Sequence, residues 1–168
     1  MKPLIGITAD WEDSGEFKSR IEGEGRYLLR DGYVNAIVHA GGEPVILPYG
    51  ENFQSVVNTI DGIVFTGGNF DIPPEISGIN DPSSARKVRP NRTHYELSLL
   101  LEGSIKRSIP TLGICGGMQL MAVAVGGQLI GDIPAEVPGA INHEQTTPRN
   151  EPFHEISVIP GTLLHKLV

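Results

Sequence analysis

Short apolar runs alternate along the chain with longer segments in which apolar residues recur every three or four positions. Each run has the length of a β-strand and is bounded by glycine, proline or polar residues, whereas the longer segments have the spacing of helices. The pattern predicts strands at residues 4–8, 44–48, 60–66, 109–114, 128–130 and 155–159. It predicts helices at residues 26–40, 53–58, 92–107 and 118–125, and a helical turn at 162–168.

The predicted strands alternate with helices, and most of them are continuous apolar runs. Such strands are typical of a parallel sheet that helices cover on both faces. We therefore expect an α/β fold with a mostly parallel, doubly wound sheet. Two segments, 11–25 and 69–91, are rich in polar residues, Gly or Pro and are predicted to be loops. Since ligands bind at the carboxyl ends of parallel strands, the residues that follow the strands are the candidate site.

Cys115, the only cysteine, lies in the segment 113–119 (GICGGMQ), between a predicted strand and a predicted buried helix. A side chain on such an elbow is pushed out of the sheet into a cleft, and the neighbouring glycines allow the strained turn. The helix N-terminus favours the thiolate. Most lone cysteines are small core residues, but a core cysteine does not need these glycines. The segment therefore predicts a nucleophile.

A nucleophile that attacks an acyl group requires N–H donors for the oxyanion of the tetrahedral intermediate. The N–H of the residue after the nucleophile, here Gly116, is a natural donor. A second donor is expected from Gly67 or Gly68, which follow another predicted strand and should share the cleft. Phosphate binding is disfavoured, because neither glycine cluster is followed by Lys and then Ser or Thr.

A thiolate nucleophile usually has a histidine base. Of the five histidines, His143 is the most plausible cleft residue, because it lies in a polar loop after the elbow helix. A surface position is the simpler interpretation for each histidine taken alone. The pairs 143–144 and 154–155 are both His-Glu, but adjacent side chains on extended backbone point in opposite directions. We expect no metal site.

The length and the net charge of the chain limit the number of domains and the kinds of partner that we expect. The 168 residues suit one domain spanning residues 1–168. A net charge of −7 argues against nucleic acid or an anionic membrane surface as the main partner. No segment approaches the length that spans a bilayer, and a single cysteine cannot form an intrachain disulfide. We expect a cytoplasmic protein.

The segment GICGGMQ resembles the G-x-C-x-G-x-Q nucleophile motif of class I glutamine amidotransferase domains. Other segments make the chain similar to the γ-glutamyl-γ-aminobutyrate hydrolases of the peptidase C26 group. They are residues 4–8 (LIGIT), 41–44 (GGEP), 66–74 (TGGNFDIPP), 118–120 (MQL), 126–127 (GG), 143 with 145 (H and Q) and 160–164 (PGTLL). The resemblance covers nearly the whole chain and implies a flavodoxin-like sheet.

The resemblance implies hydrolysis of a γ-glutamyl amide through a thioester, in polyamine catabolism, without a metal or organic cofactor. Cys115 would attack, and the N–H groups of Gly116 and of Gly67 or Gly68 would hold the oxyanion. The partner is then a small γ-glutamyl molecule, and the protein is expected to form a homodimer. Most close relatives have Arg where this chain has Gly116, which bears on the choice of substrate.

The resemblance also implies roles for three further residues. Gln119 would help to shape the glutamyl pocket, and His143 and Gln145 would contact the substrate. The long loop at 69–91 is expected to select the amine half of the substrate.

The base and its carboxylate in this family lie in a W-H-P-E-type segment, which no part of this sequence matches. We therefore expect the N-terminal part of a longer protein, whose fold lacks its C-terminal part. Two alternatives to the hydrolase stay open. One is a glutaminase subunit that passes ammonia to a synthase. The other is a catalytically dead relative that binds γ-glutamyl metabolites or a protein partner.

Overall fold

The computed structural model describes residues 1–18, 21–50, 53–79, 81–82, 85, 87–143, 145–148 and 151–168. They form two compact units, Met1–Gly131 and Asp132–Val168. The interpretation of residues 1–168 as one domain stays a prediction. Among the described residues, no helix combines the length and the apolar character that crossing a bilayer requires.

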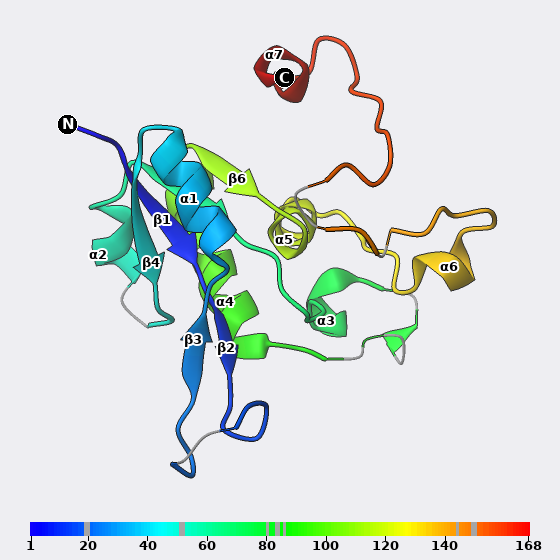
Figure 1. Ribbon diagram of the computed structural model, residues 1–168, viewed down its shortest axis with the longest axis horizontal. Helices are drawn as coiled ribbons and strands as arrows, with labels where there is room; N and C mark the ends of the chain where they lie inside the picture. The colour runs from blue at the N-terminus through cyan, green and yellow to red at the C-terminus, as the bar shows by residue number, and fades with distance from the viewer. Residues whose placement is uncertain are drawn as a thin grey trace. The chain divides into compact units, whose positions relative to one another are not determined.

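Four parallel strands form the sheet of the first unit (Figure 1). They are β1 (Leu4–Thr8), β4 (Glu43–Leu47), β5 (Gly62–Phe65) and β6 (Thr111–Gly113). Their order across the sheet is β4-β1-β5-β6. If the four strands are counted along the chain, their order across the sheet is 2-1-3-4. This is the beginning of a flavodoxin-like order. The expected α/β fold with a parallel sheet is confirmed.

One row of side chains crosses all four strands in register and shows where the sheet is buried. Ile46, Ile7, Val64 and Leu112 follow one another along this row. Ile7 and Val64, on the central strands, are 0% and 5% exposed, whereas Ile46 and Leu112, on the edges, are 49% and 55% exposed. Consecutive residues, which face opposite sides of the sheet, are buried throughout β5 and at residues 6–8 of β1, whereas β4 and β6 contain exposed residues. Burial on both faces therefore holds for the two central strands and not for the edges.

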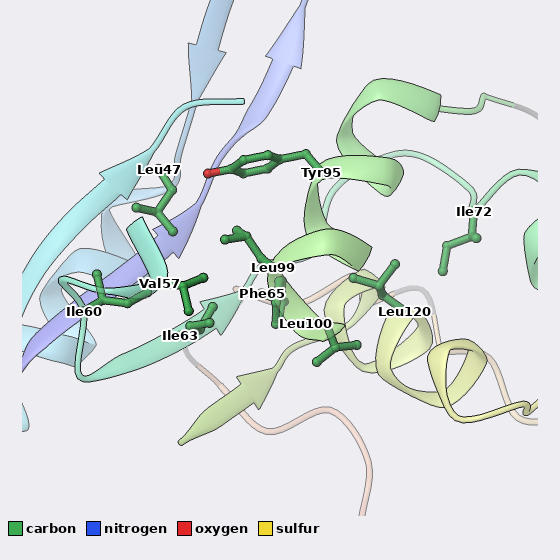
Figure 2. Packing of buried hydrophobic residues seen from close by; sticks show 10 residues of the cluster. All are labelled: Leu47, Val57, Ile60, Ile63, Phe65, Ile72, Tyr95, Leu99, Leu100 and Leu120. Atoms are coloured by element: carbon green, nitrogen blue, oxygen red, sulfur yellow. The ribbon is translucent and has the colours of Figure 1, made fainter. Parts of the chain in front are cut away.

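Helices pack against this sheet to form the core of the first unit. Helix α1 (Asp31–His39) contacts β1 and β4, and α5 (Gly116–Ala124) contacts β5 and β6. Helix α2 (Phe53–Val57) lies against α4 (Pro90–Leu99), which continues as the π-helical segment η2 (Leu100–Ile105). Figure 2 shows the buried cluster: Leu47, Val57, Ile60, Ile63, Phe65, Ile72, Tyr95, Leu99, Leu100 and Leu120.

The predicted helices at residues 92–107 and 118–125 are present with shifted ends. The first begins at Pro90, a residue that fits the first helical turn because an N–H there has no intrahelical acceptor. The second begins at Gly116 and is not fully buried, because Met118 is 57% exposed and Val125, just after its last residue, is 76% exposed. An apolar run alone does not distinguish a buried helix from one with an open face.

An antiparallel hairpin occupies the region where the sequence predicted a loop and the start of a helix. It pairs β2 (Asp10–Glu12) with β3 (Arg26–Leu28), and α1 begins only at Asp31. The rings of Trp11 and Tyr27 lie 4.8 Å apart across it. Such cross-strand pairs stabilise a hairpin, but they join residues that are distant in sequence. The remainder of the predicted loop 11–25 is irregular, and residues 19 and 20 lie outside the described residues.

The described part of the predicted loop 69–91 contains the short helix α3 (Pro74–Ser77), and the last two residues of the predicted loop already belong to α4. A bridge between Asp71 and Val88 closes the base of this loop, with the Asp71 N–H donating to the Lys87 carbonyl at 2.6 Å. Residues 80, 83, 84 and 86 of the loop lie outside the described residues.

Two predicted strands are wrong. Residues 128–130 make no ladder with the described strands; instead, the Leu129 N–H donates to the Ser77 carbonyl at the end of α3, at 3.1 Å. Residues 155–159 belong to the second unit and form no strand, and Ile156 and Ile159 are 72% and 71% exposed. Alternating polarity produces a strand only where a neighbouring strand accepts its hydrogen bonds.

The described residues of the second unit form the short helices α6 (Ile133–Glu136) and α7 (Leu163–Leu167). Each begins after a capping side chain: Asp132 accepts from the Ala135 N–H, and Thr162 accepts from the His165 N–H. Helix α7 confirms the predicted helical turn at the end of the sequence.

Candidate functional site

Cys115 lies on a strand-to-helix elbow, as the sequence predicts. Strand β6 ends at Gly113, helix α5 begins at Gly116, and Cys115 is the N-cap, with φ 55° and ψ −110°. A positive φ at a residue other than glycine costs on the order of 1–3 kcal/mol, and such strain is concentrated at functional sites. The thiol is exposed. The elbow therefore presents the sulfur to solvent on a strained backbone.

The beginning of α5 packs directly on the backbone of β5. A β-carbon added to Gly117 would lie 2.2 Å from the carbonyl oxygen of Phe65, so this position admits only glycine without a shift of the backbone. The same carbonyl accepts a hydrogen bond from the Ile114 N–H at 3.0 Å. The two contacts fix the elbow against the neighbouring strand.

Residues 66–68, here named the glycine loop, follow β5 and reach the nucleophile. A β-carbon on Gly67 would lie 2.9 Å from the Cβ of Cys115 and 3.3 Å from its Sγ. A β-carbon on Gly116 would lie 3.7 Å from the Cα of Gly67. The backbones of the glycine loop and of the elbow are therefore in direct contact, and the common cleft expected for these residues stays a prediction.

The N–H groups of the predicted oxyanion donors differ in their surroundings. The Gly67 N–H donates to the hydroxyl oxygen of Tyr33 at 3.1 Å. Within the part of the chain that the structure describes, neither the Gly68 N–H nor the Gly116 N–H donates a hydrogen bond. These two groups are the donors that a bound oxyanion would find without an intramolecular acceptor.

The ring of Phe70, which the sequence analysis did not single out, joins the parts of the site. A β-carbon on Gly68 would lie 2.6 Å from this ring, and a β-carbon on Gly116 would lie 3.3 Å from it. The guanidinium carbon of Arg92 lies 4.2 Å from the ring centroid, in the geometry of a cation–π contact. Phe70 therefore packs between the glycine loop, the elbow and Arg92.

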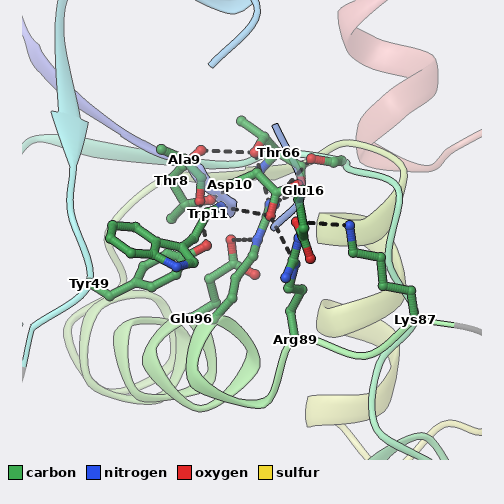
Figure 3. Close-up of polar contacts among 12 residues, drawn as sticks. Thr8, Ala9, Asp10, Trp11, Glu16, Tyr49, Thr66, Lys87, Arg89 and Glu96 are labelled. Atoms are coloured by element: carbon green, nitrogen blue, oxygen red, sulfur yellow. Dashed lines mark hydrogen bonds and ion pairs between the residues drawn. The ribbon is translucent and has the colours of Figure 1, made fainter. Parts of the chain in front are cut away.

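Arg92 and Glu96 form a buried ion pair behind the glycine loop, one turn apart on α4. Arg92 is 0% exposed and Glu96 1%, and the Arg92 Nε donates to the Glu96 Oε1 at 3.0 Å. Burial raises the pKa of the Glu96 carboxyl, and the neighbouring Arg92 opposes this effect. Figure 3 shows Glu96 in the polar network that includes Thr8, Asp10 and Thr66. The sequence shows only an Arg and a Glu four positions apart, a spacing that is far more common on exposed helix faces.

Gln119 lies one helical turn after the nucleophile, in the same unit. Its N–H donates to the Cys115 carbonyl at 3.1 Å, and its side chain is partly buried. The spacing of four residues places both positions on one face of the helix. The first unit therefore brings Gln119 together with Cys115 and the three predicted oxyanion glycines.

His143 and Gln145 lie in the second unit. The His143 Nδ1 is 3.2 Å from the Nε2 of His154, so the two histidines of the His-Glu pairs contact each other. The side-chain amide of Gln145 donates to the Thr147 Oγ1 and to the carbonyls of Pro148 and Glu151, at 3.2, 2.8 and 3.1 Å. These contacts are all local. Glu144 lies outside the described residues, and the remaining described residues hold no cluster of three or more metal-binding side chains.

A charged cluster and an aromatic cavity lie in the first unit beside this site. Hydrogen bonding by Arg89 lowers the pKa of Glu16 from 4.5 to about 2, and Lys87 binds the same carboxylate (Figure 3). The cavity has a volume of about 1020 Å³ and is lined by fourteen residues, among them Trp11, Tyr27 and Tyr49. Neither Cys115 nor any of the predicted oxyanion glycines lines it.

Comparison with known proteins identifies the family of the chain. The family model of peptidase C26 matches residues 3–168. The chain is 31% identical to a glutamine amidotransferase-like protein of Rickettsia prowazekii, over 99% of this chain and 72% of that protein. It is 30% identical to protein NtpR of Enterococcus hirae, over 100% of this chain and 70% of that protein.

A third relative carries the name of an enzyme. It is the γ-glutamyl-γ-aminobutyrate hydrolase of Escherichia coli strain K12, which is 29% identical over 99% of this chain. The chain spans 65% of the length of that hydrolase. The elbow cysteine, the parallel sheet and the match over nearly the whole sequence lead to one conclusion. The chain belongs to the peptidase C26 family and is of the glutamine amidotransferase-like type.

Proposed function

We propose that the protein hydrolyses γ-glutamyl amides with Cys115 as the nucleophile. The observation that carries the proposal is the strained elbow that presents Cys115 beside Gly67. The family match and the hydrolase among the relatives support it. The Cys115 sulfur attacks the γ-carbonyl carbon, the C–N bond breaks, and the amine leaves with a proton. Water then hydrolyses the γ-glutamyl thioester, which releases glutamate and restores the thiol.

The N–H groups of Gly116 and Gly68 hold the oxyanion of the tetrahedral intermediates. Gly68 is preferred over Gly67 as the second donor, because the Gly67 N–H already donates to Tyr33. Removal of one such donor typically costs roughly 3–4 kcal/mol in the transition state. No metal or organic cofactor takes part. We assign the base to no residue among these 168.

The glutamyl half of the substrate binds near Gln119, which lies one turn along the helix from the nucleophile. His143 and Gln145 are further substrate-binding residues in this proposal, and the loop at 69–91 selects the amine half. A homodimer is the proposed assembly. The substrate is a small molecule, and neither nucleic acid nor a membrane is required.

The test uses the full gene product and γ-glutamyl-γ-aminobutyrate, with release of the free amine as the readout. We expect Cys115→Ala to lower kcat by about 10³-fold or more, since the nucleophile is lost. The matched control is Met118→Ala, which changes an exposed side chain on the same helix and should leave the rate unchanged. Hydrolysis by Cys115→Ala at the rate of the unsubstituted protein would refute the proposal.

A glutaminase that supplies ammonia to a synthase is the second candidate. The amidotransferase-like name of the Rickettsia prowazekii relative favours it. Parallel assays with glutamine and with γ-glutamyl-γ-aminobutyrate separate the two functions. The hydrolase should act alone and prefer the substituted amide, whereas a glutaminase subunit should prefer glutamine and require a partner protein for full activity.

A further inference from the structure

The buried guanidinium of Arg92 contacts the glycine loop at three atoms. Its Nη2 lies 2.8 Å from the Thr66 carbonyl oxygen, 2.9 Å from the Thr66 Oγ1 and 3.3 Å from the Gly67 carbonyl oxygen. Thr66 is also tied to β1, because its hydroxyl donates to the Thr8 carbonyl and its N–H donates to the Thr8 hydroxyl. Arg92 therefore holds two consecutive carbonyl groups of the loop that reaches Cys115.

The guanidinium has further contacts, although its Nη1 is buried and donates no hydrogen bond within the described residues. Its Nε donates to Glu96, its Nη1 lies 3.3 Å from the Asp10 carboxylate, and its plane lies over the ring of Phe70. Burying such a pair costs desolvation energy, and replacement by apolar residues is often neutral for stability. No apolar side chain, however, reproduces hydrogen bonds to the backbone of the glycine loop. The contacts with the loop are what distinguish Arg92 from an apolar residue of similar size.

Peptide geometry connects these contacts to the N–H groups of the loop. In a planar trans peptide, the carbonyl of one residue and the N–H of the next point in opposite directions. The Thr66 carbonyl faces Arg92, so the Gly67 N–H points away from it, and its acceptor is indeed a different residue, Tyr33. By the same geometry the Gly67 carbonyl faces Arg92, and the Gly68 N–H points away from the guanidinium with no acceptor among the described residues.

We propose that Arg92 is a positioning residue that sets the peptide plane between Gly67 and Gly68 and so aims the Gly68 N–H at the oxyanion. Glu96 and Asp10 hold the guanidinium in this orientation. Arg92 touches neither the substrate nor Cys115; it acts through the glycine loop. The inference rests on the proposed function, because an oxyanion forms only if Cys115 attacks an acyl group.

The decisive variant replaces both buried charges, Arg92→Met with Glu96→Leu, so that no unpaired charge stays in the core. The matched control is Lys106→Met with Glu102→Leu, which removes an ion pair of the same spacing from an exposed surface. A second variant, Arg92→Lys, keeps the positive charge but loses the planar fork that reaches two carbonyls at once. Each protein is assayed for kcat and KM with γ-glutamyl-γ-aminobutyrate, and thermal unfolding shows that it is folded.

Alkylation of Cys115 by iodoacetamide at one fixed pH is the second readout, because this reaction forms no oxyanion at the loop. We expect the Arg92→Met/Glu96→Leu variant to lose about 10²-fold in kcat, with KM and the alkylation rate changed by less than roughly threefold. Arg92→Lys should likewise lower kcat while KM and the alkylation rate stay nearly unchanged. The control variant should match the unsubstituted protein in all three quantities. If the buried double variant does not fold, Arg92→Lys decides.

The outcomes separate this inference from the proposed function. A folded Arg92 variant with the kcat of the unsubstituted protein overturns the positioning role and leaves the Cys115 mechanism intact. Parallel losses of kcat and of alkylation also overturn it, because they indicate a general disturbance of the elbow. If the unsubstituted protein shows no Cys115-dependent hydrolysis, the proposed function fails, and the positioning role fails with it.

Discussion

The two units hold their predicted site residues in different ways. In the first unit, Cys115 lies against Gly67, and the glycine loop is bonded to an arginine with 0% exposure. In the second, the side chains of His143 and Gln145 bond to residues at most eleven positions away on exposed chain. Acyl transfer tolerates misplacement of a donor by only a fraction of an ångström. Long-range buried contacts supply that precision, and local exposed hydrogen bonds fix only the shape of a loop.

The largest expected effect tests the packing beneath the elbow. Gly117→Ala places a methyl group 2.2 Å from a backbone oxygen of β5, so the strand or the helix must move. We expect the free energy of unfolding to fall by about 3 kcal/mol or more. The control is Gly32→Ala on α1, where the added carbon meets nothing within 4 Å and should be neutral or stabilising. Equal urea midpoints for the two variants would contradict the close approach.

A pair of leucines compares the units directly. Leu99 is 0% exposed in the first unit, and Leu167 is 72% exposed in the second. Truncation to alanine should cost about 2–5 kcal/mol at Leu99 and under about 0.5 kcal/mol at Leu167. Urea denaturation measures both. A cost at Leu167 as large as that at Leu99 would show that the second unit has a core of its own, and the comparison would fail.

Gln145 tests how much the exposed local hydrogen bonds of the second unit contribute to stability. Its amide donates to three acceptors on exposed chain, so Gln145→Ala should lower the free energy of unfolding by at most about 1 kcal/mol. Thr146→Ala, at an exposed neighbour, is the control. A larger decrease in the free energy of unfolding for Gln145→Ala than for Leu99→Ala would contradict the comparison. It would show that these local hydrogen bonds stabilise the whole unit and not only a loop.

The smallest effect concerns Glu16 on the surface of the first unit. Its pKa of about 2 in the folded protein lies below its ordinary value of 4.5, mainly because of the hydrogen bond from Arg89. The depressed pKa stabilises the fold above about pH 4.5, and this contribution is lost as the pH falls from about 4.5 to 2. The variant Glu16→Gln lacks this contribution. The difference in free energy of unfolding between the unsubstituted protein and the variant should therefore shrink as the pH falls over that interval. A constant difference from about pH 6 to pH 2 would argue against the ion pair.

The sequence predicts the parts of the fold that local patterns determine. The strand Leu4–Thr8 has the predicted limits, and Cys115 lies on the predicted elbow. The hairpin was missed because Trp11 and Tyr27 meet across a long intervening segment. Residues 128–130 and 155–159 have strand-like patterns, but a strand also requires a partner, which no local pattern supplies.

The sequence predicts the backbone of the candidate site, namely the elbow and the glycine loop. It does not predict the buried side chains that hold this backbone in place. The combination of a cysteine with neighbouring glycines on a predicted turn is unusual, and it is what predicts the nucleophile from the sequence. Arg92 and Glu96 have the spacing of an ordinary exposed ion pair, and only the packing of α4 against the sheet shows that both are buried. Likewise, the contact of Phe70 with Gly68 and Gly116 depends on how the chain folds back.

Trapping the covalent intermediate tests most directly whether Cys115 is the nucleophile. The full gene product is mixed with γ-glutamyl-γ-aminobutyrate, quenched in acid during turnover, digested and examined by mass spectrometry. We expect one γ-glutamyl group in thioester linkage on the peptide that contains Cys115, and no such adduct in Cys115→Ala. Steady turnover without an adduct on that peptide, or with an adduct on another residue, would contradict this role of Cys115.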